Sequence, residues 1–370
     1  TTVSDDDRES LTPTYTWSVG SNTYTGDSIQ LDSTMSAPGD SITCTVDVAD
    51  GYGGTATDTA SVTVTNTDPV ISDVTIGYSG DLTSTTQLAC NYSATDADNQ
   101  TLTPSYTWTN LSTNTQFAST ASTLQLTPSI VSPTDVVECS VTVTDTSNGS
   151  VTLAASETVL NTDPTFVMSA TVSTNGTQVG DTWTCYAAGT DQDDGTLTPT
   201  YEWQDANGTF VASGSSLTLS SSNSAPNTDL TCVATLTDSL NATATSSASA
   251  TVTNTAPTFD VSASIAPNTG VVTASLLTCT GSASDADGDT PVLTYAWTDS
   301  NGNTLGNGTD TLTLTNVLVA PSDVITCTIT ATDDQGDSVT SSASVTVDNS
   351  NPTIDSLVLT PNSGVDSETS

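Results

Sequence analysis

Aspartate residues at fixed distances from cysteines are the residues of this chain best suited to chemistry. Six and eight positions after Cys90, Cys185 and Cys279 stand Asp96 and Asp98, Asp191 and Asp193, and Asp285 and Asp287. Six positions after Cys44, Cys139, Cys232 and Cys327 stand Asp50, Asp145, Asp238 and Asp333. Asp68 and Asp163 belong to the linkers that enter the second and third repeats, and Asp289 ends the run Asp285-Ala-Asp-Gly-Asp289. Carboxylate oxygens are the preferred ligands of calcium, so the pattern predicts calcium sites.

Two interpretations of these carboxylates remain open. In the first, calcium binds where successive repeats meet and stiffens the chain. In the second, each Asp follows a strand because its side chain caps a tight turn. The run from Asp285 to Asp289 has alternating Asp residues but lacks the later Glu of an EF-hand. Ala256 stands where Asp68 and Asp163 stand in the other linkers, so the third linker is predicted to bind calcium most weakly.

The composition excludes several classes of function. The chain has one basic residue, Arg8, no Lys and no His, against 42 acidic residues, for a net charge of −41. Without a cationic surface it should bind neither nucleic acid nor anionic lipid. Without His or Lys it can build no Ser/His/Asp or Cys/His catalytic system and no Schiff base. Paired carboxylates of the glycosidase kind remain conceivable, but they repeat along the chain instead of marking one pocket, and we predict no enzymatic activity.

A repeat of about 94 residues underlies these spacings. The run Leu102-Thr-Pro-Ser-Tyr-Thr-Trp108 recurs around Trp17, Trp203 and Trp297, and the four tryptophans lie 91, 95 and 94 residues apart. Tyr and Trp two positions apart share one face of a β-strand, while Thr occupies the other face. We therefore predict a strand at each copy, with Trp17, Trp108, Trp203 and Trp297 in the cores.

Proline-containing motifs separate the repeats. They are Asn66-Thr-Asp-Pro69, Asn161-Thr-Asp-Pro164, Asn254-Thr-Ala-Pro257 and Asn349-Ser-Asn-Pro352. Proline cannot continue a central ladder, so each motif is expected to end one domain and open the next. The predicted domains are 1–68 (incomplete, without its first strands), 69–163, 164–256, 257–351, and 352–370 as the first strand of a further domain.

The predicted fold class is all-β, a tandem array of sandwiches. In the fourth repeat, strands are expected at 276–279, 293–297, 311–315, 324–330 and 342–347, with turn signals every 8 to 12 residues. No segment keeps a helical period, and this pattern is typical of a sandwich of short strands. No stretch of 18 apolar residues predicts a membrane span.

The run Ser284-Asp-Ala-Asp-Gly-Asp-Thr290, followed by Leu293-Thr-Tyr-Ala-Trp297, resembles the tandem Ig-like repeats of large bacterial surface proteins, including PKD-type and cadherin-like modules. The resemblance implies an Ig-like sandwich in which the Trp packs on a disulfide between strands B and F. The implied pairs are Cys90–Cys139, Cys185–Cys232 and Cys279–Cys327. Strands B and F run in the same direction, so both sets of Asp should lie at the end of the sandwich where the preceding linker enters.

Cys44 occupies the strand F position of the first repeat, and its partner is expected outside this segment of chain. Two interpretations are open. The chain can be a window of a longer array, or residues 352–370 can supply a strand to the first domain of the next copy. The second interpretation leaves Cys44 unpaired.

Regularly placed cysteines indicate an oxidising, extracellular compartment. We predict a structural repeat protein that forms a rod of sandwiches about 40 Å long each, as subunit or segment of a cell-surface filament that associates with itself. The alternative is the stalk of an adhesin that binds glycans or another cell. Exposed Thr-rich strand faces are expected to suit O-glycans of a glycoprotein.

Overall fold

The computed structural model describes residues 1–358, and strands are the only regular elements in that range. No helix there could therefore cross a membrane. Contacts divide the chain into two compact units, which are described separately. The first unit consists of Thr1–Thr165, Thr190–Leu197 and Thr237–Thr243, and the second holds the remainder of the described chain.

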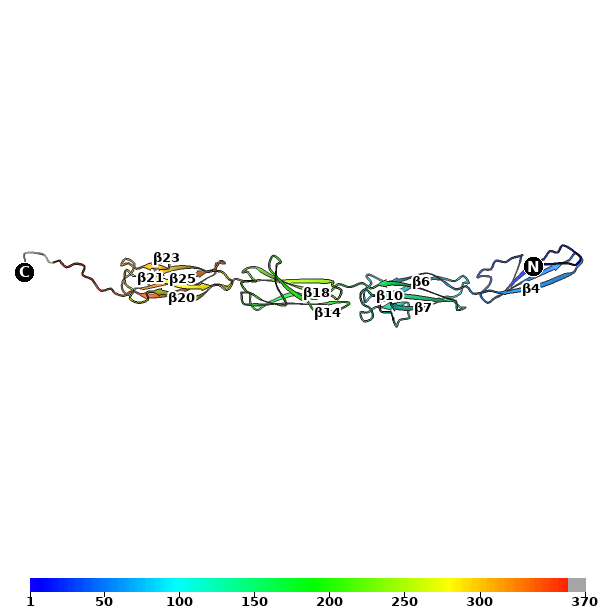
Figure 1. Cartoon of the computed structure of the whole chain (residues 1–370), viewed down its shortest axis with the longest axis horizontal. Helices are drawn as coiled ribbons and strands as arrows, with labels where there is room; N and C mark the ends of the chain where they lie inside the picture. Colours follow the sequence, from blue (N-terminus) through cyan, green and yellow to red (C-terminus); the bar gives the residue numbers. More distant parts are fainter. Residues whose placement is uncertain (359–370) are drawn as a thin grey trace, which may run out of the picture. The chain divides into compact units, whose positions relative to one another are not determined.

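The first unit begins with a single four-stranded sheet of order β2-β1-β3-β4 (Figure 1). Its strands are β1 (Thr14–Val19), β2 (Asn22–Thr25), β3 (Ser41–Ala49) and β4 (Thr55–Thr63). The register places Trp17 opposite Cys44. No second sheet belongs to this segment within residues 1–358, so one face of β1 and β3 lacks the cover that a sandwich provides.

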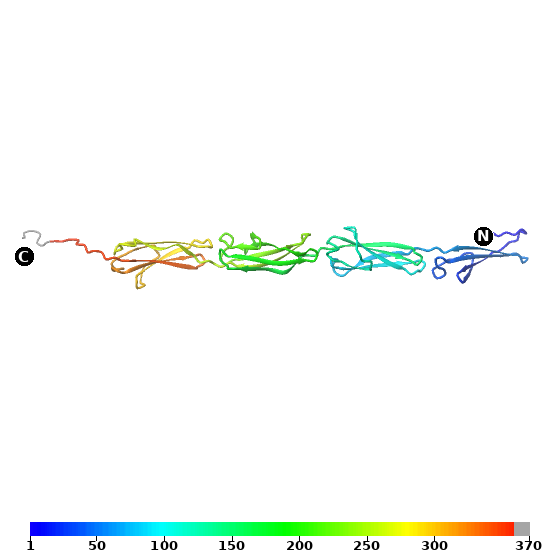
Figure 2. The same ribbon diagram turned by 90° about the horizontal axis from the view of Figure 1, so that it is seen from below.

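A two-layered sandwich follows in the same unit (Figure 2). One sheet has the order β5-β6-β9 and the other has the order β11-β10-β7-β8. The first is built from β5 (Val70–Gly77), β6 (Gln87–Thr95) and β9 (Thr123–Gln125). The second is built from β7 (Thr103–Asn110), β8 (Thr115–Gln116), β10 (Val136–Thr144) and β11 (Ser150–Thr158).

The second unit holds the cores of two further sandwiches with related sheet orders. The third sandwich comprises β12 (Thr165–Thr174), β13 (Thr182–Asp191), β14 (Gly195–Leu197), β15 (Thr200–Gln204), β16 (Phe210–Ser213), β17 (Ser216–Thr218), β18 (Asp229–Thr237) and β19 (Thr243–Thr251). The fourth comprises β20 (Thr258–Ala266), β21 (Leu276–Ser284), β22 (Val292–Thr298), β23 (Thr304–Asn307), β24 (Thr311–Thr313), β25 (Val324–Thr332) and β26 (Ser338–Thr346). The predicted all-β class and Ig-like sandwich array are confirmed.

Strict alternation along the strands explains why these residues form sheets. In β25, Ile325, Cys327 and Ile329 are buried and the intervening Thr side chains face outward. Side chains of successive strand residues point to opposite faces, and β-branched Thr packs well on a pleated surface. The outer face of such a strand therefore remains polar without carrying charge.

Disulfides join strands B and F in each complete sandwich, where strand B is β6, β13 or β21 and strand F is β10, β18 or β25. The bonded pairs are Cys90–Cys139, Cys185–Cys232 and Cys279–Cys327, with Cα–Cα distances of 6.2, 6.3 and 6.4 Å. Trp108, Trp203 and Trp297 are fully buried. Each lies opposite the strand F cysteine in the register, and each indole nitrogen donates a hydrogen bond to a backbone carbonyl.

Trp17 differs from the expected core position. It remains partly exposed, although its indole nitrogen donates to the carbonyl of Gly26 at 2.9 Å like its counterparts. The cause is the single sheet: no opposing layer within residues 1–358 covers the face that holds Trp17 and Cys44. Cys44 is a free, partly exposed thiol.

Strands stop before each predicted linker, and they resume directly after the proline of the first three. β4 ends at Thr63 and β5 begins at Val70, on either side of the first linker. The first strand expected in 352–370 is not formed in residues 352–358, which have no assigned strand and are exposed. The rest of that expected strand lies outside the described residues.

Candidate functional site: carboxylate loops at the linkers

Each aspartate six positions after a strand B cysteine ends its strand in a turn. Oδ1 of Asp96 accepts a hydrogen bond from the amide of Asp98 at 2.9 Å. The same bond joins Asp191 to the amide of Asp193 and Asp285 to the amide of Asp287, each at 2.7 Å. This two-residue bond is the turn that Asp forms with its own backbone. The predicted turn-capping role is therefore present at all three positions.

The aspartates that follow strand F close hairpins. Oδ1 of Asp145 accepts the amides of Ser147 and Gly149, both at 2.8 Å. Asp238 and Asp333 accept the equivalent pair of amides in their own hairpins. One carboxylate oxygen thus satisfies two turn amides, and the other oxygen remains available for a second partner.

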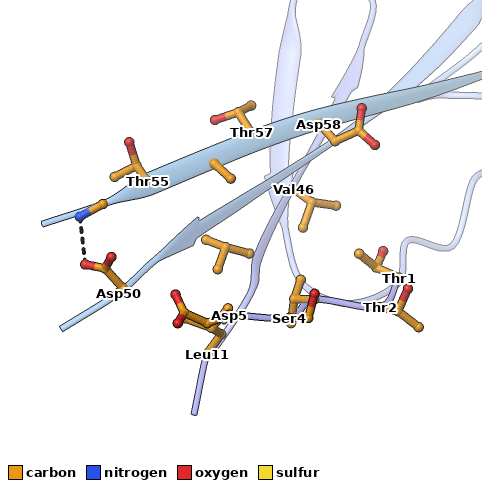
Figure 3. Close-up of a pocket in the computed structure, with 14 residues that line it drawn as sticks. Thr1, Thr2, Ser4, Asp5, Leu11, Val46, Asp50, Thr55, Thr57 and Asp58 are labelled. Carbon is orange, nitrogen blue, oxygen red and sulfur yellow. Dashed lines mark hydrogen bonds between the residues drawn. The ribbon is translucent and has the colours of Figure 1, made fainter. Parts of the chain in front are cut away.

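The first sheet repeats this hairpin closure. Asp50 accepts amide hydrogen bonds from Tyr52 at 2.8 Å and from Gly54 at 2.7 Å, and the latter bond is drawn in Figure 3. A hollow of 420 Å³ nearby is lined by Thr, Ser, Asp and aliphatic side chains (Figure 3). Its lining has no His, Lys or Cys.

The linkers supply the second partner of the strand F aspartates. The side-chain nitrogen of the linker Asn donates to Oδ2 of the Asp at 2.8 Å in all three cases. The pairs are Asn66 with Asp145, Asn161 with Asp238, and Asn254 with Asp333. A hydrogen bond to a charged acceptor is stronger than one between neutral groups. Each linker is therefore held to the hairpin that follows it.

The strand B aspartates bind the next residue of each linker. The amide of Thr67 donates to Oδ2 of Asp98 at 2.7 Å. The amide of Thr162 donates to Asp193 at 2.9 Å and that of Thr255 donates to Asp287 at 2.6 Å. We call this pair of contacts, one from the Asn side chain and one from the following amide, the linker clamp.

The structure thus brings both predicted aspartate sets to their linker, as the even spacing indicated. Asp68 also lies close to the first hairpin. The Oδ1 atom of Asp68 and the Oδ2 atom of Asp145 both lie against Gly149, and a Cβ atom added to Gly149 would be 2.5 Å from each of them. Asp163 is exposed to solvent. The clamp donors Asn66, Asn161 and Asn254 were missed by sequence reasoning, although the repetition of Asn at the head of each linker was a usable signal.

Hydrogen bonding changes the pKa of the strand F aspartates. The bond from Asn66 is the main cause that lowers the pKa of the Asp145 carboxyl. Burial acts in the opposite direction on Asp238 and Asp333, yet the bonds from their linker Asn and from turn amides lower the pKa of both. The clamp therefore holds these carboxylates in their charged form.

The loop of the fourth sandwich behaves differently. Burial is the main cause that raises the pKa of Asp285, and repulsion from Asp287, Asp289 and Asp333 adds to it. Burial and neighbouring carboxylates, Asp334 foremost, also raise the pKa of Asp289. The hydrogen bond from the amide of Asp287 lowers the pKa of Asp285 but does not offset burial and repulsion.

Several buried oxygens at the linkers have no hydrogen-bond partner. Oδ2 is unpartnered in all three strand B aspartates at the first position, which are Asp96, Asp191 and Asp285. Asp191 is only 3% exposed. Oδ1 of Asp193, Oδ2 of Asp289 and Oδ1 of Asn254 are unpartnered as well. Buried unpartnered acceptors cost stability, and oxygen atoms of this kind are the ligands that calcium takes.

A cation at these loops would need ligands beyond carboxylates. Within residues 1–358, no three acidic side chains are grouped closely enough to hold one ion by themselves. Calcium also accepts Asn carbonyl oxygens and waters in a site of six to eight ligands. The unpartnered oxygens fit part of such a shell, and water would have to complete it.

No protein-family model and no curated protein matches the chain. A solved tetra-tandem repeat from the extending region of a large adhesion protein is 20% identical, with a TM-score of 0.38 and 91% of each chain covered. A calcium-stabilised adhesin with which an Antarctic bacterium binds ice is 18% identical, with a TM-score of 0.33 over 91% of this chain and 90% of that one.

Extracellular domains 3–6 of protocadherin gamma B2 are 13% identical, with a TM-score of 0.29 over 91% of this chain and 93% of that one. The sandwich architecture is assigned on its own strand order, disulfides and tryptophans. Three structural disulfides are typical of an oxidising environment, so this is an extracellular protein. It is similar to tandem Ig-like and cadherin-like extracellular repeats.

Proposed function

We propose that this chain is a structural, non-enzymatic spacer of an extracellular repeat protein, built to hold successive sandwiches in line. The proposed domains are 1–68, 69–163, 164–256 and 257–351, with 352–370 opening a further one. The observation that carries the proposal is the linker clamp. The same two contacts hold all three linkers to the sandwich that follows, and such contacts restrict bending where a free linker would allow it.

The rod would serve as a subunit or segment of a cell-surface filament. The net charge of −41 favours long-range repulsion along the chain, which adds to extension at low salt. Self-association is the proposed partnership, and a stalk that presents an adhesin or glycan-binding head is the second candidate. Electron microscopy of native material distinguishes them: continuous filaments favour the first, and separate rods with a distinct head favour the second.

Calcium is the proposed cofactor of the linkers. The support is the set of buried, unpartnered oxygens beside the clamps together with the raised pKa values of Asp285 and Asp289. A cation would neutralise carboxylates that repel one another and would take the place of missing hydrogen-bond donors.

Small-angle X-ray scattering of the oxidised chain tests the spacer function. We expect a maximum dimension of about 150 Å, as four sandwiches in line would have. The triple variant Asn66→Ala, Asn161→Ala, Asn254→Ala removes one clamp contact from each linker and should convert the rod profile into that of a flexible chain. The control is Asn301→Ala with Asn307→Ala, which changes exposed side chains that contact none of the three clamps. An unchanged profile in the triple variant would exclude the clamp as the source of stiffness.

A further inference from the structure

One strand B loop carries a side chain that its counterparts lack. Seven residues after the strand B cysteine, the third sandwich has Gln192, whereas the second has Ala97 and the fourth has Ala286. A glutamine amide both donates and accepts hydrogen bonds, and an alanine side chain does neither. Of the three linkers, the second is therefore the one at which this position can form a polar contact with the preceding sandwich.

The side chain of Gln192 reaches the second sandwich. Its nitrogen donates hydrogen bonds to Oγ1 of Thr83 at 3.0 Å and to Oγ1 of Thr85 at 2.8 Å. These threonines belong to the loop between β5 and β6, 109 and 107 residues earlier in the chain. Both sides of the contact lie in the first compact unit, which includes Thr190–Leu197 of the third sandwich. We call these two hydrogen bonds the Gln192 bridge.

The acceptor side of the bridge is held in place by the second sandwich. Leu82, next to Thr83, is 2% exposed, and its carbonyl accepts the amide of Leu160 at 2.7 Å. The carbonyl of Thr85 accepts Nε2 of Gln125 at 2.7 Å. The two threonine hydroxyls therefore lie on a loop whose backbone is fixed by the sandwich to which it belongs.

The donor side is also constrained. Oδ1 of Asp191 accepts the amides of Asp193 and Asp194, at 2.7 and 3.0 Å. Oδ2 of Asp194 accepts the amide of Ser239, in the strand F hairpin, at 2.8 Å. Gln192 thus projects from a closed turn that is tied to the neighbouring hairpin. Because both loops are already ordered, forming the bridge costs little conformational entropy beyond that of the glutamine side chain.

We propose that the Gln192 bridge makes the second linker stiffer than the first and the third. The linker clamp is common to all three, and it holds each linker to the sandwich that follows. The bridge instead joins the following sandwich directly to the preceding one, so bending at the second linker has to break its hydrogen bonds. Ala97 and Ala286 cannot form an equivalent contact. The inference rests on the proposed spacer function and adds to it a difference between linkers: the second and third sandwiches move as a pair.

Residual dipolar couplings of the intact, oxidised chain measure this difference. Core amides of each sandwich report the alignment tensor of that sandwich, and all sandwiches are measured in one sample. We expect the second and third sandwiches to share one tensor, because the bridge limits their relative motion, and the fourth to differ from the third. Equal agreement of the tensors across the second and the third linker would overturn the proposal.

Substitutions on the two sides of the bridge test the contact itself. Gln192→Ala gives the third sandwich the alanine of its counterparts. Loss of two uncharged hydrogen bonds should raise the population of bent states at the second linker about tenfold, so the two tensors should diverge. Thr83→Val with Thr85→Val removes only the acceptor hydroxyls and should have the same effect. All three substitutions together should cause no further change, because either side alone already breaks the bridge. Additive effects would contradict the pairing.

Two matched controls leave the bridge intact. Thr75→Val removes an exposed hydroxyl from β5 of the second sandwich, and Asn307→Ala shortens an exposed amide side chain on β23 of the fourth. Neither should alter the agreement between the second and third sandwiches. A divergence in either control as large as that in Gln192→Ala would refute the role assigned to the bridge.

The clamp variant separates this inference from the spacer function. The triple alanine variant at Asn66, Asn161 and Asn254 weakens all three clamps and leaves the bridge unchanged. If its scattering profile stays rod-like, the clamp fails as the source of stiffness, and the response to Gln192→Ala still decides the bridge. If the profile becomes flexible, the second and third sandwiches should retain the best agreement of tensors. Equal loss of agreement at every linker would show that the bridge does not stiffen the second.

Discussion

The length of chain that the second sandwich releases when it is unfolded by force should depend strongly on whether its disulfide is closed. Strands β5 to β11 run from Val70 to Thr158, and the bonded cysteines Cys90 and Cys139 are separated by 49 residues. A closed disulfide shields the residues of its loop from tension. Only about 40 of about 90 residues can then extend, at roughly 3.3–3.6 Å each.

Unfolding the oxidised sandwich should therefore release about 140 Å of chain, and unfolding the reduced one about 310 Å. The difference of about 170 Å does not depend on the folded dimensions. Loss of the loop constraint should also lower the free energy of unfolding by about 4 kcal/mol in the chain-entropy treatment. The third and fourth sandwiches, with separations of 47 and 48 residues, should behave alike.

Single-molecule stretching of the intact chain, with and without a reductant, measures these lengths. The sheet β1–β4 provides an internal control, because Cys44 is unpaired there and reduction should leave its extension unchanged. Cys90→Ser with Cys139→Ser should reproduce the reduced length for one sandwich only. Release of the full length from the oxidised wild-type chain would show that the disulfides do not limit extension.

Three further predictions concern packing and pH. Trp183 is fully buried, where the second and fourth sandwiches have Leu. Trp183→Leu should leave a cavity and destabilise the third sandwich by about 2–4 kcal/mol, as measured by exchange of core amides. The pKa of Asp145 is lowered, so its carboxylate stabilises the folded state fully above the ordinary Asp value of about 3.9. This stabilisation is lost as pH falls through the lowered pKa. Asn66→Ala should move the loss to higher pH, as an NMR titration of the Asp145 carboxyl would measure. The pKa of Asp285 is raised, so its charged carboxylate destabilises the folded state at pH values above that raised pKa. In chelator, amide hydrogen exchange at the third linker should therefore slow as pH falls from there toward about 3.9. Amide exchange that only accelerates over this range would contradict the prediction.

Much of the fold could be predicted because its determinants are periodic. The tryptophan spacing, the alternation in β25 and the cysteine positions each depend on local strand geometry or on a repeated distance along the chain. The convergence of Asp98 and Asp145 on one linker also followed, because an even number of residues separates each from a cysteine in a disulfide-linked strand. Such arguments require only the direction of strands and the side on which a residue points.

The contacts of the linkers could not be predicted in the same way. Whether Asn66 donates to Asp145, and whether Gln192 reaches Thr83, depends on side-chain rotamers and loop paths from segments far apart in sequence. The exposure of Trp17 was also missed, because its motif is the same as that of buried copies. Burial depends on a second layer, and residues 1–68 were expected to lack the first strands that would build it.

The sequence by itself determined the repeat, the sandwich class, the extracellular chemistry of the cysteines and the grouping of carboxylates, since each follows from spacing and composition. The tertiary structure alone decided how those carboxylates are used. Most of them accept hydrogen bonds from turn and linker amides, and a few buried oxygens remain without a donor. The physical reason is that hydrogen bonds and ion ligation require donor and acceptor atoms to meet within about 3 Å, and a spacing along the chain specifies a neighbourhood without specifying that contact.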